Sequence, residues 1–221
     1  MKRLLVLRPE PGAGSTAAKA RELGLEPECV PLFQIEAIDW RGPDPARFEG
    51  LLLTSANAVR YAGACLRRYR GLKAYAVGDA TAEAARDAGF DVAASGDSGV
   101  DRLLASVEPG LKLLHLCGEH RREADRPRQT ITPVAVYRSN EVVDPDLTRA
   151  SSSVALIHSP RAGRRFAQLV TDRQSIIIAA ISSAASNAVG RGWHSVSIAE
   201  QPNEEALLAL AARLCKNPQP G

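Results

Sequence analysis

The chain has 221 residues, of which 45% are hydrophobic, 24% charged and 5% aromatic. This composition is ordinary for a globular protein, argues against broad disorder, and allows one large core or two modest ones. The formal net charge of +3 is small for a nucleic-acid binder, and in the arginine-rich stretches 67–70, 121–128 and 161–165 one aromatic residue, Tyr69, is interleaved, too few for a base-stacking surface. We therefore expect no nucleic-acid partner, and interpret the arginines as solvated helix faces or as groups that attract a small polyanion.

The cysteines and histidines show no pattern typical of a metal site or a disulfide framework. The four cysteines lie far apart and form no CxxC motif that could join His115 and His120 in a zinc-finger ligand set. The N-terminus has an apolar stretch of only four residues, and no segment approaches the length needed to span a membrane. We expect a cytoplasmic protein with no metal and no membrane partner.

The first 39 residues predict a strand, a helix and a long extended segment. The strand covers residues 3–8, and the helix covers residues 15–23, with Ser15 as its N-cap and Gly24 as its C-terminal stop. Residues 26–39 are extended but too long for one strand. We expect this segment to leave one sheet and continue as a linker.

Strands and helices alternate through the middle of the chain. The expected strands cover residues 51–54, 73–77, 91–94 and 112–116, and the expected helices cover residues 56–69, 79–88 and 100–107. Residues 119–129 are too polar, and too interrupted by Pro127, to form a long packed helix. Residues 131–140 are again extended and long, which predicts a second linker.

The same alternation returns in the last third of the chain. The expected strands cover residues 154–158, 176–181 and 195–199, and the expected helices cover residues 161–170, 183–190 and 204–214. The tail after residue 215 is expected to fray.

An internal echo relates these two α/β stretches. Ser55 and Gly78 are 78 − 55 = 23 positions apart, and Ser159 and Ser182 are 182 − 159 = 23 positions apart. The offset between the copies is 159 − 55 = 104 positions, and the hydrophobic pattern keeps that register. We interpret the copies as two related α/β units.

Repeated βα alternation with apolar strands predicts parallel sheets and right-handed crossovers. Two long extended segments that bracket one unit predict a discontinuous domain one, residues 1–37 and 142–221, with domain two, residues 38–141, inserted through two linkers. Ligands of parallel sheets bind beyond the carboxyl ends of the strands. We expect the site at those ends, between the two domains.

Small and hydroxylated residues follow four of the strands, in TSANAV, GDATAEAA, HSPRAG and ISSAAS. Such junctions expose helix N-termini, whose N–H groups and dipole favour anions. Alternatively, each hydroxyl only caps its helix. The residues expected at the strand ends as ligand-binding groups are Arg8, Thr54, Ser55, Asn57, Gly78, Thr81, Gly118, Ser159, Arg161, Ser182 and Ser183.

Two further features have an open interpretation. Residues 12–17 match GxGxxA, the dinucleotide-binding pattern, but Arg8-Pro9-Glu10-Pro11 lies between the apolar part of the strand, Leu4 to Leu7, and the first glycine. Tyr137 ends a strand of the return linker. Its hydroxyl either donates a proton to a leaving group or belongs to a packing residue at the domain interface.

These motifs together resemble the uroporphyrinogen-III synthase family over nearly the whole chain. The resemblance is carried by the order and spacing of VLRPEPGA, PLFQIE, LLLTSANAV, YAVGDATAEAARDAGF, VAVYRS, IHSPRAG and AISSAASNAV. It implies two flavodoxin-like (Rossmann-like) α/β domains joined by two extended linkers. It also implies a lyase of the hydro-lyase type that closes the linear tetrapyrrole hydroxymethylbilane to uroporphyrinogen III, with loss of water and inversion of ring D, in tetrapyrrole and haem biosynthesis.

The resemblance implies no cofactor and no metal, and a substrate with eight carboxylates, which agrees with the anion-binding junctions. Tyr137 matches the family tyrosine proposed to assist departure of the hydroxyl, and Thr81 matches a family threonine. The chain departs from the family at Ala185, where a threonine is common, and in a shortened segment over residues 119–130. That shortening leaves the role of Arg121 or Arg122 open.

Two other functions are compatible with the residues. One is a non-catalytic two-domain protein that binds a polyanion, and the other is a nucleotide-dependent enzyme that uses the Gly12–Ala17 loop. We expect a monomer in each case, because two linkers and a modest size favour a flexible single chain.

Overall fold

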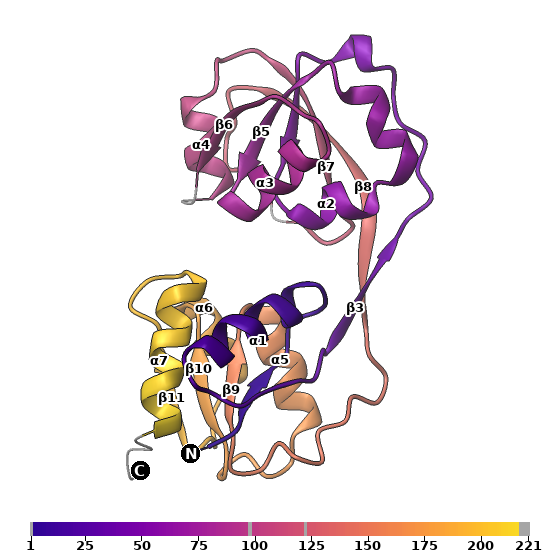
Figure 1. Ribbon diagram of the computed structural model, residues 1–221. Helices are drawn as coiled ribbons and strands as arrows, with labels where there is room; N and C mark the ends of the chain where they lie inside the picture. The colour runs from indigo at the N-terminus through magenta and orange to yellow at the C-terminus, as the bar shows by residue number, and fades with distance from the viewer. Residues whose placement is uncertain (1, 97–98, 122, 217–221) are drawn as a thin grey trace. The chain divides into compact units, whose positions relative to one another are not determined.

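The computed structural model describes residues 2–96, 99–121 and 123–216 (Figure 1). The expectations for Arg122 and for the tail after Lys216 therefore lie outside the described residues. The chain divides into two compact units, which are described separately below. Unit 1 comprises residues 1–34 and 141–221, and unit 2 comprises residues 35–140.

Unit 1 contains one parallel sheet with helices on both faces. Its elements are β1 (Leu4–Val6), α1 (Gly12–Glu22), β2 (Pro27–Cys29), β9 (Val154–Ile157), α5 (Pro160–Leu169), β10 (Ile177–Ala180), α6 (Ser183–Val189), β11 (Ser195–Ile198) and α7 (Glu204–Lys216). The strand order is β2-β1-β9-β10-β11. Numbered along the unit, this is 2-1-3-4-5, the flavodoxin-like order.

Unit 2 is built around a second sheet, in the order β3-β8-β7-β4-β5-β6. Its elements are β3 (Phe33–Ala37), the 3₁₀ helix η1 (Pro45–Arg47), β4 (Gly50–Leu53), α2 (Ala56–Tyr61), the 3₁₀ helix η2 (Gly63–Tyr69), β5 (Lys73–Val77), α3 (Asp79–Asp87), β6 (Val92–Gly96), α4 (Val100–Ser106), β7 (Lys112–Gly118) and β8 (Thr130–Glu141). The strands from β8 to β6 pair in parallel. The prediction of parallel α/β sheets is confirmed for both units.

The two units share one strand order through a circular permutation. The predicted echo superposes β4, β5 and β6 on β9, β10 and β11. In unit 1 the sheet continues from β9 to β1 and β2, and in unit 2 it continues from β4 to β7 and β8. The strands that open the chain in unit 1 therefore correspond to strands that close unit 2. By the same correspondence, α7 matches α4, and α1 matches the segment between β7 and β8, residues 119–129.

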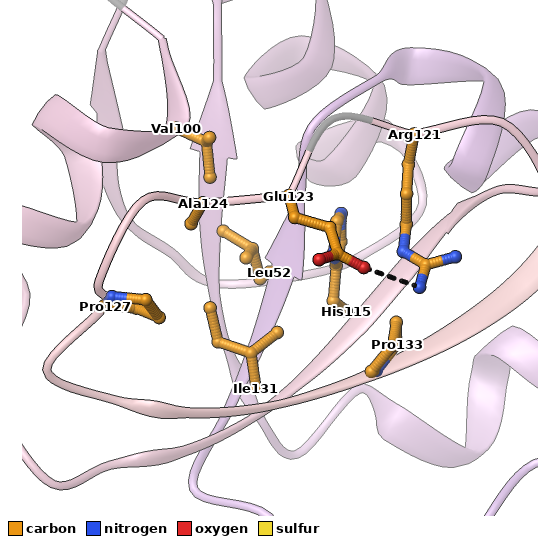
Figure 2. A pocket seen from close by; sticks show the side chains of 9 residues that line it. All are labelled: Leu52, Val100, His115, Arg121, Glu123, Ala124, Pro127, Ile131 and Pro133. Atoms are coloured by element: carbon orange, nitrogen blue, oxygen red, sulfur yellow. Dashed lines mark hydrogen bonds and ion pairs between the residues drawn. The ribbon is translucent and has the colours of Figure 1, made fainter.

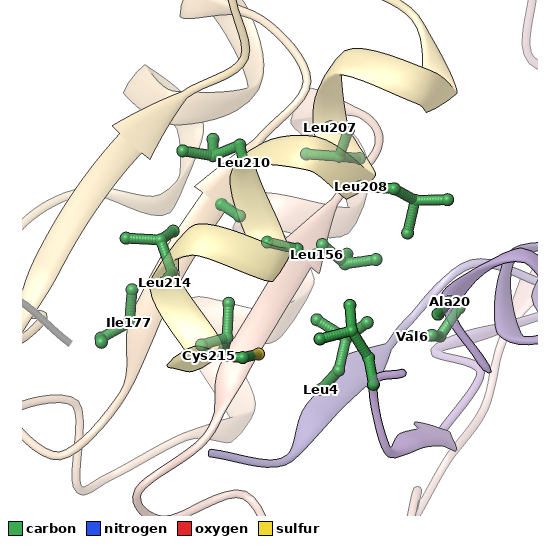
Figure 3. Close-up of a cluster of buried hydrophobic side chains, with 14 of the residues drawn as sticks. Leu4, Val6, Ala20, Leu156, Ile177, Leu207, Leu208, Leu210, Leu214 and Cys215 are labelled. Atoms are coloured by element: carbon green, nitrogen blue, oxygen red, sulfur yellow. The ribbon is translucent and has the colours of Figure 1, made fainter. Parts of the chain in front are cut away.

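Each sheet separates two hydrophobic clusters. In unit 1, α1 and α7 pack on one face and α5 and α6 on the other. Figure 3 shows Leu207, Leu210 and Leu214 of α7 in one cluster with Leu4, Leu156 and Ile177 of the strands. In unit 2, α2, η2 and α3 cover one face, whereas the other has only α4 and part of the 119–129 segment. The short α4, with 7 residues against 13 in α7, leaves this last cluster small.

Two predicted helix boundaries are wrong. The first helix begins at Gly12, not Ser15, because the Glu10 carboxylate accepts the N–H of Gly14 (2.9 Å) and the Pro9 carbonyl accepts that of Ala13 (3.1 Å). The expected helix over residues 56–69 breaks after α2, because Gly63 adopts a φ of +65°, which a right-handed helix excludes. Gly24, at a φ of +72°, ends α1 as predicted.

The long segment over residues 26–39 divides into β2, in the sheet of unit 1, and β3, in the sheet of unit 2. The segment therefore leaves one sheet as predicted, and where a linker was expected it forms strand β3 of the other sheet. Among the described residues, the helices are all too short or too polar to cross a membrane.

Phe166 is fully buried, and its ring stacks on Trp193 with the centroids 5.4 Å apart. We expect Phe166→Ala to lower the unfolding free energy of unit 1 by about 3–5 kcal/mol, through lost burial and the cavity left behind. In a Trp40→Phe background, Trp193 is the only tryptophan, so its fluorescence in a denaturant titration follows unit 1. The control is Val143→Ala at a side chain that is 89% exposed, and an equal loss in both variants would contradict the prediction.

Candidate functional site

The carboxyl ends of β4, β7 and β8 bring the predicted residues of unit 2 together. β4 pairs with β7 up to Leu53 and Leu116, and β7 pairs with β8 up to Gly118 and Tyr137. A register shift after Cys117 changes the pairing at the end of β8. Tyr137 consequently packs on the side of the sheet that α2 and α3 cover.

Tyr137 is half-buried beside Ser55 and Tyr61. Its ring lies 6.4 Å from that of Tyr61, centroid to centroid. Burial raises the pKa of the Tyr137 phenol, and a hydrogen bond with the Ser55 side chain lowers it by a smaller amount. The Ser55 oxygen also accepts the backbone N–H of Asn57 at 3.2 Å.

Gly118 provides the space that the Tyr137 ring occupies. A β-carbon at position 118 would lie 2.8–3.0 Å from the ring and hydroxyl atoms of Tyr137, closer than real β-carbons approach. The glycine predicted as a binding residue therefore has a steric role in this arrangement.

Thr54 directs its hydroxyl to His115, on β7, with 3.0 Å between Oγ1 and Nε2. His115 is only 5% exposed. Burial, with a smaller contribution from the nearby positive charge of Arg121, lowers the pKa of His115 from 6.5 to about 4. The imidazole is therefore neutral at physiological pH, with one N–H donor and one acceptor nitrogen.

The remaining predicted residues of unit 2 surround the start of α3. Gly78 holds the N-cap position with a φ of +82°, and no side chain caps the helix there. Thr81 is buried in the first turn. The first turn of α3 thus presents backbone N–H groups that no hydroxyl covers, as anion-binding helix ends do.

In unit 1, the predicted serines all lie at helix starts. Ser159 accepts the N–H of Ala162 (3.2 Å), and Ser182 accepts that of Ala185 (3.3 Å), so both cap their helices. Ser183 is the first residue of α6. A capping hydroxyl accepts with its oxygen and keeps its proton, so each cap can still donate to a ligand carboxylate.

Arg8 is engaged within unit 1. Its guanidinium donates to Glu204 (3.1 Å) and to Thr16 (3.3 Å), while Glu204 also accepts from Thr16 and lies 3.1 Å from Nε2 of His158. Burial alone would raise the pKa of Glu204, but the bonds and charges of His158, Thr16 and Arg8 lower it to about 2. A ligand carboxylate at Arg8 would therefore compete with Glu204.

Arg161, at the start of α5, lies over the ring of Phe33, with 4.3 Å from Cζ to the centroid. This cation–π contact holds the guanidinium over Phe33, a residue of unit 1.

The Gly12–Ala17 segment does not form a phosphate-binding loop. Both glycines lie in the first turns of α1, and the N–H of Gly14 is taken by Glu10. A β-carbon at Gly12 would meet the Arg8 side chain at 2.6 Å, so this glycine accommodates a protein side chain. The geometry required for pyrophosphate is absent from this segment.

Sequence reasoning missed the partners of these residues. His115 faces Thr54 across 61 positions, and Glu204 faces Arg8 across 196 positions. The only available signal was polar residues at apolar strand ends, namely His115 in LLHLCG and His158 in VALIHS. The part of the chain that the structure describes contains no group of three His, Cys, Asp or Glu side chains placed to hold a metal ion.

His115 makes stability depend on pH in a defined window. The unfolded chain binds a proton at this residue near pH 6.5, whereas the folded protein binds it only near pH 4. Between these values the unfolded state holds more protons, so stability falls as the pH is lowered, by about 3 kcal/mol over the full window. We expect His115→Gln to remove this part of the pH dependence of the unfolding free energy, and the exposed control His120→Gln to retain it. Equal slopes for wild type and His115→Gln would contradict the assignment.

Comparison with known proteins agrees with this architecture. The family uroporphyrinogen-III synthase HemD matches residues 14–209. The crystal structure of uroporphyrinogen-III synthetase from Helicobacter pylori 26695 is similar over 97% of this chain and 100% of that chain, with a TM-score of 0.67 and 18% identity. A mutant uroporphyrinogen III synthase from the extremely thermophilic bacterium Thermus thermophilus is similar over 97% and 100% of the two chains, with a TM-score of 0.52 and 17% identity.

At 18% and 17% identity, the similarity to these two crystal structures shows a shared fold and nothing beyond it. No curated protein sequence matches the chain. The family match, however, spans nearly all of both units and confirms the resemblance seen in the sequence motifs: the chain belongs to the uroporphyrinogen-III synthase HemD family.

Proposed function

We propose that this chain is a uroporphyrinogen-III synthase, which closes hydroxymethylbilane to uroporphyrinogen III with loss of water and inversion of ring D. The observation that carries the proposal is the family match over residues 14–209. The arrangement of Tyr137, Ser55 and Gly118 adds a proton donor of suitable chemistry at one strand end.

The substrate supplies the reactive electrons in this reaction. Loss of its hydroxyl produces a cationic azafulvene, and the far ring attacks this group at a substituted carbon to form a spiro intermediate. Unassisted closure gives the isomer that is not inverted, so the protein must hold the chain in the geometry that favours the spiro path. This is catalysis by positioning, and it requires no nucleophile.

The groups at the strand ends are suited to bind the carboxylates of the substrate. We propose that the hydroxyls of Ser159 and Ser182, the N–H groups at the start of α3, and Arg161 each donate to a carboxylate. Helix N-termini and guanidinium groups are well suited to this role. The remaining predicted residues, Arg8, Thr54, Asn57, Thr81 and Ser183, are proposed to line or shape the same binding surfaces.

Tyr137 is proposed to donate its proton to the departing hydroxyl. Burial raises the pKa of its phenol, so the group stays protonated at neutral pH. We propose that Ser55 donates to the phenol oxygen, so that the Tyr137 O–H points at a ligand. A hydroxide leaving group becomes water when it receives this proton, which lowers the barrier to its departure.

The reaction class would be a lyase, and we propose a cytoplasmic monomer with a small-molecule substrate and no cofactor. The tetrapyrrole substrate of the family supports the small-molecule assignment.

The isomer assay tests the proposed function directly. Purified protein added to hydroxymethylbilane should divert closure from uroporphyrinogen I to uroporphyrinogen III, as measured by chromatography of the oxidised products. A product mixture that contains only isomer I would refute the function. A protein that binds the tetrapyrrole without turnover would give that same mixture, so the assay separates an enzyme from a binding protein.

Tyr137→Phe tests the proton donor. We expect kcat to fall by about 100-fold, the lower end for general acid catalysis, while product affinity changes little. Tyr61→Phe makes the same chemical change on the neighbouring ring and should leave kcat nearly unchanged. Equal losses of kcat and product affinity in Tyr137→Phe would make Tyr137 a binding or packing residue.

A further inference from the structure

Unit 2 contains a cavity of about 310 Å³ on the face of the sheet opposite Tyr137. Figure 2 shows the side chains around it, with Arg121 and Glu123 on one side and aliphatic groups on the other. The lining consists of Leu52, Val100, His115, Arg121, Glu123, Ala124, Pro127, Ile131 and Pro133. Its volume falls at the lower end of the range for small-molecule sites.

The circular permutation explains why the cavity exists. The corresponding face of unit 1 is covered by α1, a helix of 11 residues, and by α7. In unit 2, the segment that matches α1 passes over the sheet without helix in its described residues. An extended segment covers less of the sheet than a helix of about 10 Å diameter, and the space between this segment and α4 stays open.

The residues at the matching positions also differ in polarity. The first residue of α7 is Glu204, which contacts Arg8, Thr16 and His158 and so occupies the space at this end of the sheet of unit 1. The first residue of α4, at the same place in the echo, is Val100, which lines the cavity. The polar cluster that closes this place in unit 1 therefore has no counterpart among the described residues of unit 2.

A polar group nevertheless lies in the wall of the cavity. His115 bonds through Nε2 to Thr54, and the hydrogen bonds of the described residues include none to its other ring nitrogen. The residue is 5% exposed and lines the cavity. When the Thr54 hydroxyl donates to Nε2, the neutral ring carries its proton on Nδ1 and offers a donor to an occupant.

Arg121 supplies a positive charge at the same cavity. Its guanidinium lies 3.5 Å from the carboxylate of Glu123, and the Glu123 side chain is 82% exposed. Because the Glu123 carboxylate is so exposed, its ion pair contributes little to stability, and another carboxylate can replace Glu123 at small cost. A guanidinium and a neutral imidazole beside an apolar wall are complementary to a carboxylate on an apolar body.

We propose that this cavity is a binding site for a carboxylate carried by a small aromatic or aliphatic group. Arg121 and His115 bind the carboxylate, and Leu52, Val100 and Ile131 pack on the apolar part. The ligand is either one carboxylate-bearing ring of the tetrapyrrole or a separate small organic acid. The existence of the site does not rest on the proposed function, because its occupancy is measured without turnover.

The test uses 3-phenylpropionate as the probe and 3-phenylpropionamide as its uncharged control, with the full-length protein. Calorimetry should give one site for the acid, with at least about tenfold weaker binding of the amide, since the amide loses a charge-assisted hydrogen bond. An NMR titration of the histidine rings should show the His115 pKa rising on binding, because a nearby negative charge favours the imidazolium.

Three variants separate this site from non-specific binding. Arg121→Gln should weaken the acid by about tenfold while Arg102→Gln, on the exposed side of α4, should not change its affinity. Ala124→Phe should fill the cavity and abolish binding. Absence of binding at millimolar acid, equal affinity for acid and amide, or unchanged affinity in both Arg121→Gln and Ala124→Phe would overturn the proposal.

Competition identifies the source of the carboxylate. If 3-phenylpropionate competes with hydroxymethylbilane and Ala124→Phe raises KM, one ring of the substrate uses the site. If the acid binds without competition, the site serves a separate organic acid. Both outcomes retain the site, and failure of the isomer assay would leave the calorimetric result intact.

Discussion

The parallel register of β4 and β7 is the constraint on which the candidate site depends. Leu52 lies opposite His115 and Leu53 opposite Leu116, so the two residues after β4 emerge beside the end of β7. Extended backbone sends successive side chains to opposite faces. Thr54 therefore reaches His115 on one face, and Ser55 reaches Tyr137 on the other. A slip of one residue would exchange these partners and move each side chain of the strand to the other face of the sheet. Such a slip is excluded because Leu51, Leu52 and Leu53 are all buried in their present register.

The two units show how one strand order supports different chemistry. In unit 1, the half-buried carboxylate of Glu204 is compensated by Arg8, Thr16 and His158, which offsets the cost of partly removing its charge from water. That arrangement ties α7 to α1 and β9, and it occupies Arg8. In unit 2, the matching helix begins with Val100 and the matching connection is not helical in its described residues. Space and a neutral histidine remain where unit 1 has a salt-bridge cluster. The divergence of the copies thus leaves this face of unit 1 filled by its own side chains and the matching face of unit 2 with a cavity.

The strands, most helices and the division into two α/β units could be predicted from the sequence, because apolar runs and capping residues are local signals. The break of the second helix depends on the positive φ of Gly63. A glycine within a helical pattern is compatible with either sign of φ, so the sequence does not predict the break. The early start of α1 depends on the Glu10 side chain folding back on Gly14. Strand order, and with it the permutation, follows from tertiary pairing. The partners of Arg8 and Thr54 were hidden for the same reason, since they come from strands and helices distant in sequence.

A substrate with many carboxylates is positioned by many hydrogen-bond donors, each of which contributes a small part of the binding free energy. Each hydrogen bond to a carboxylate contributes only a few kcal/mol at most, so the loss of one leaves the others in place. This accounts for Ala185, whose methyl group is buried and whose backbone N–H is held by Ser182. A threonine there would add one donor, yet the helix end around it keeps its N–H groups and dipole. The same distribution explains why the capping serines serve the fold and the proposed site together: a cap uses the oxygen lone pair, and binding a carboxylate uses the proton.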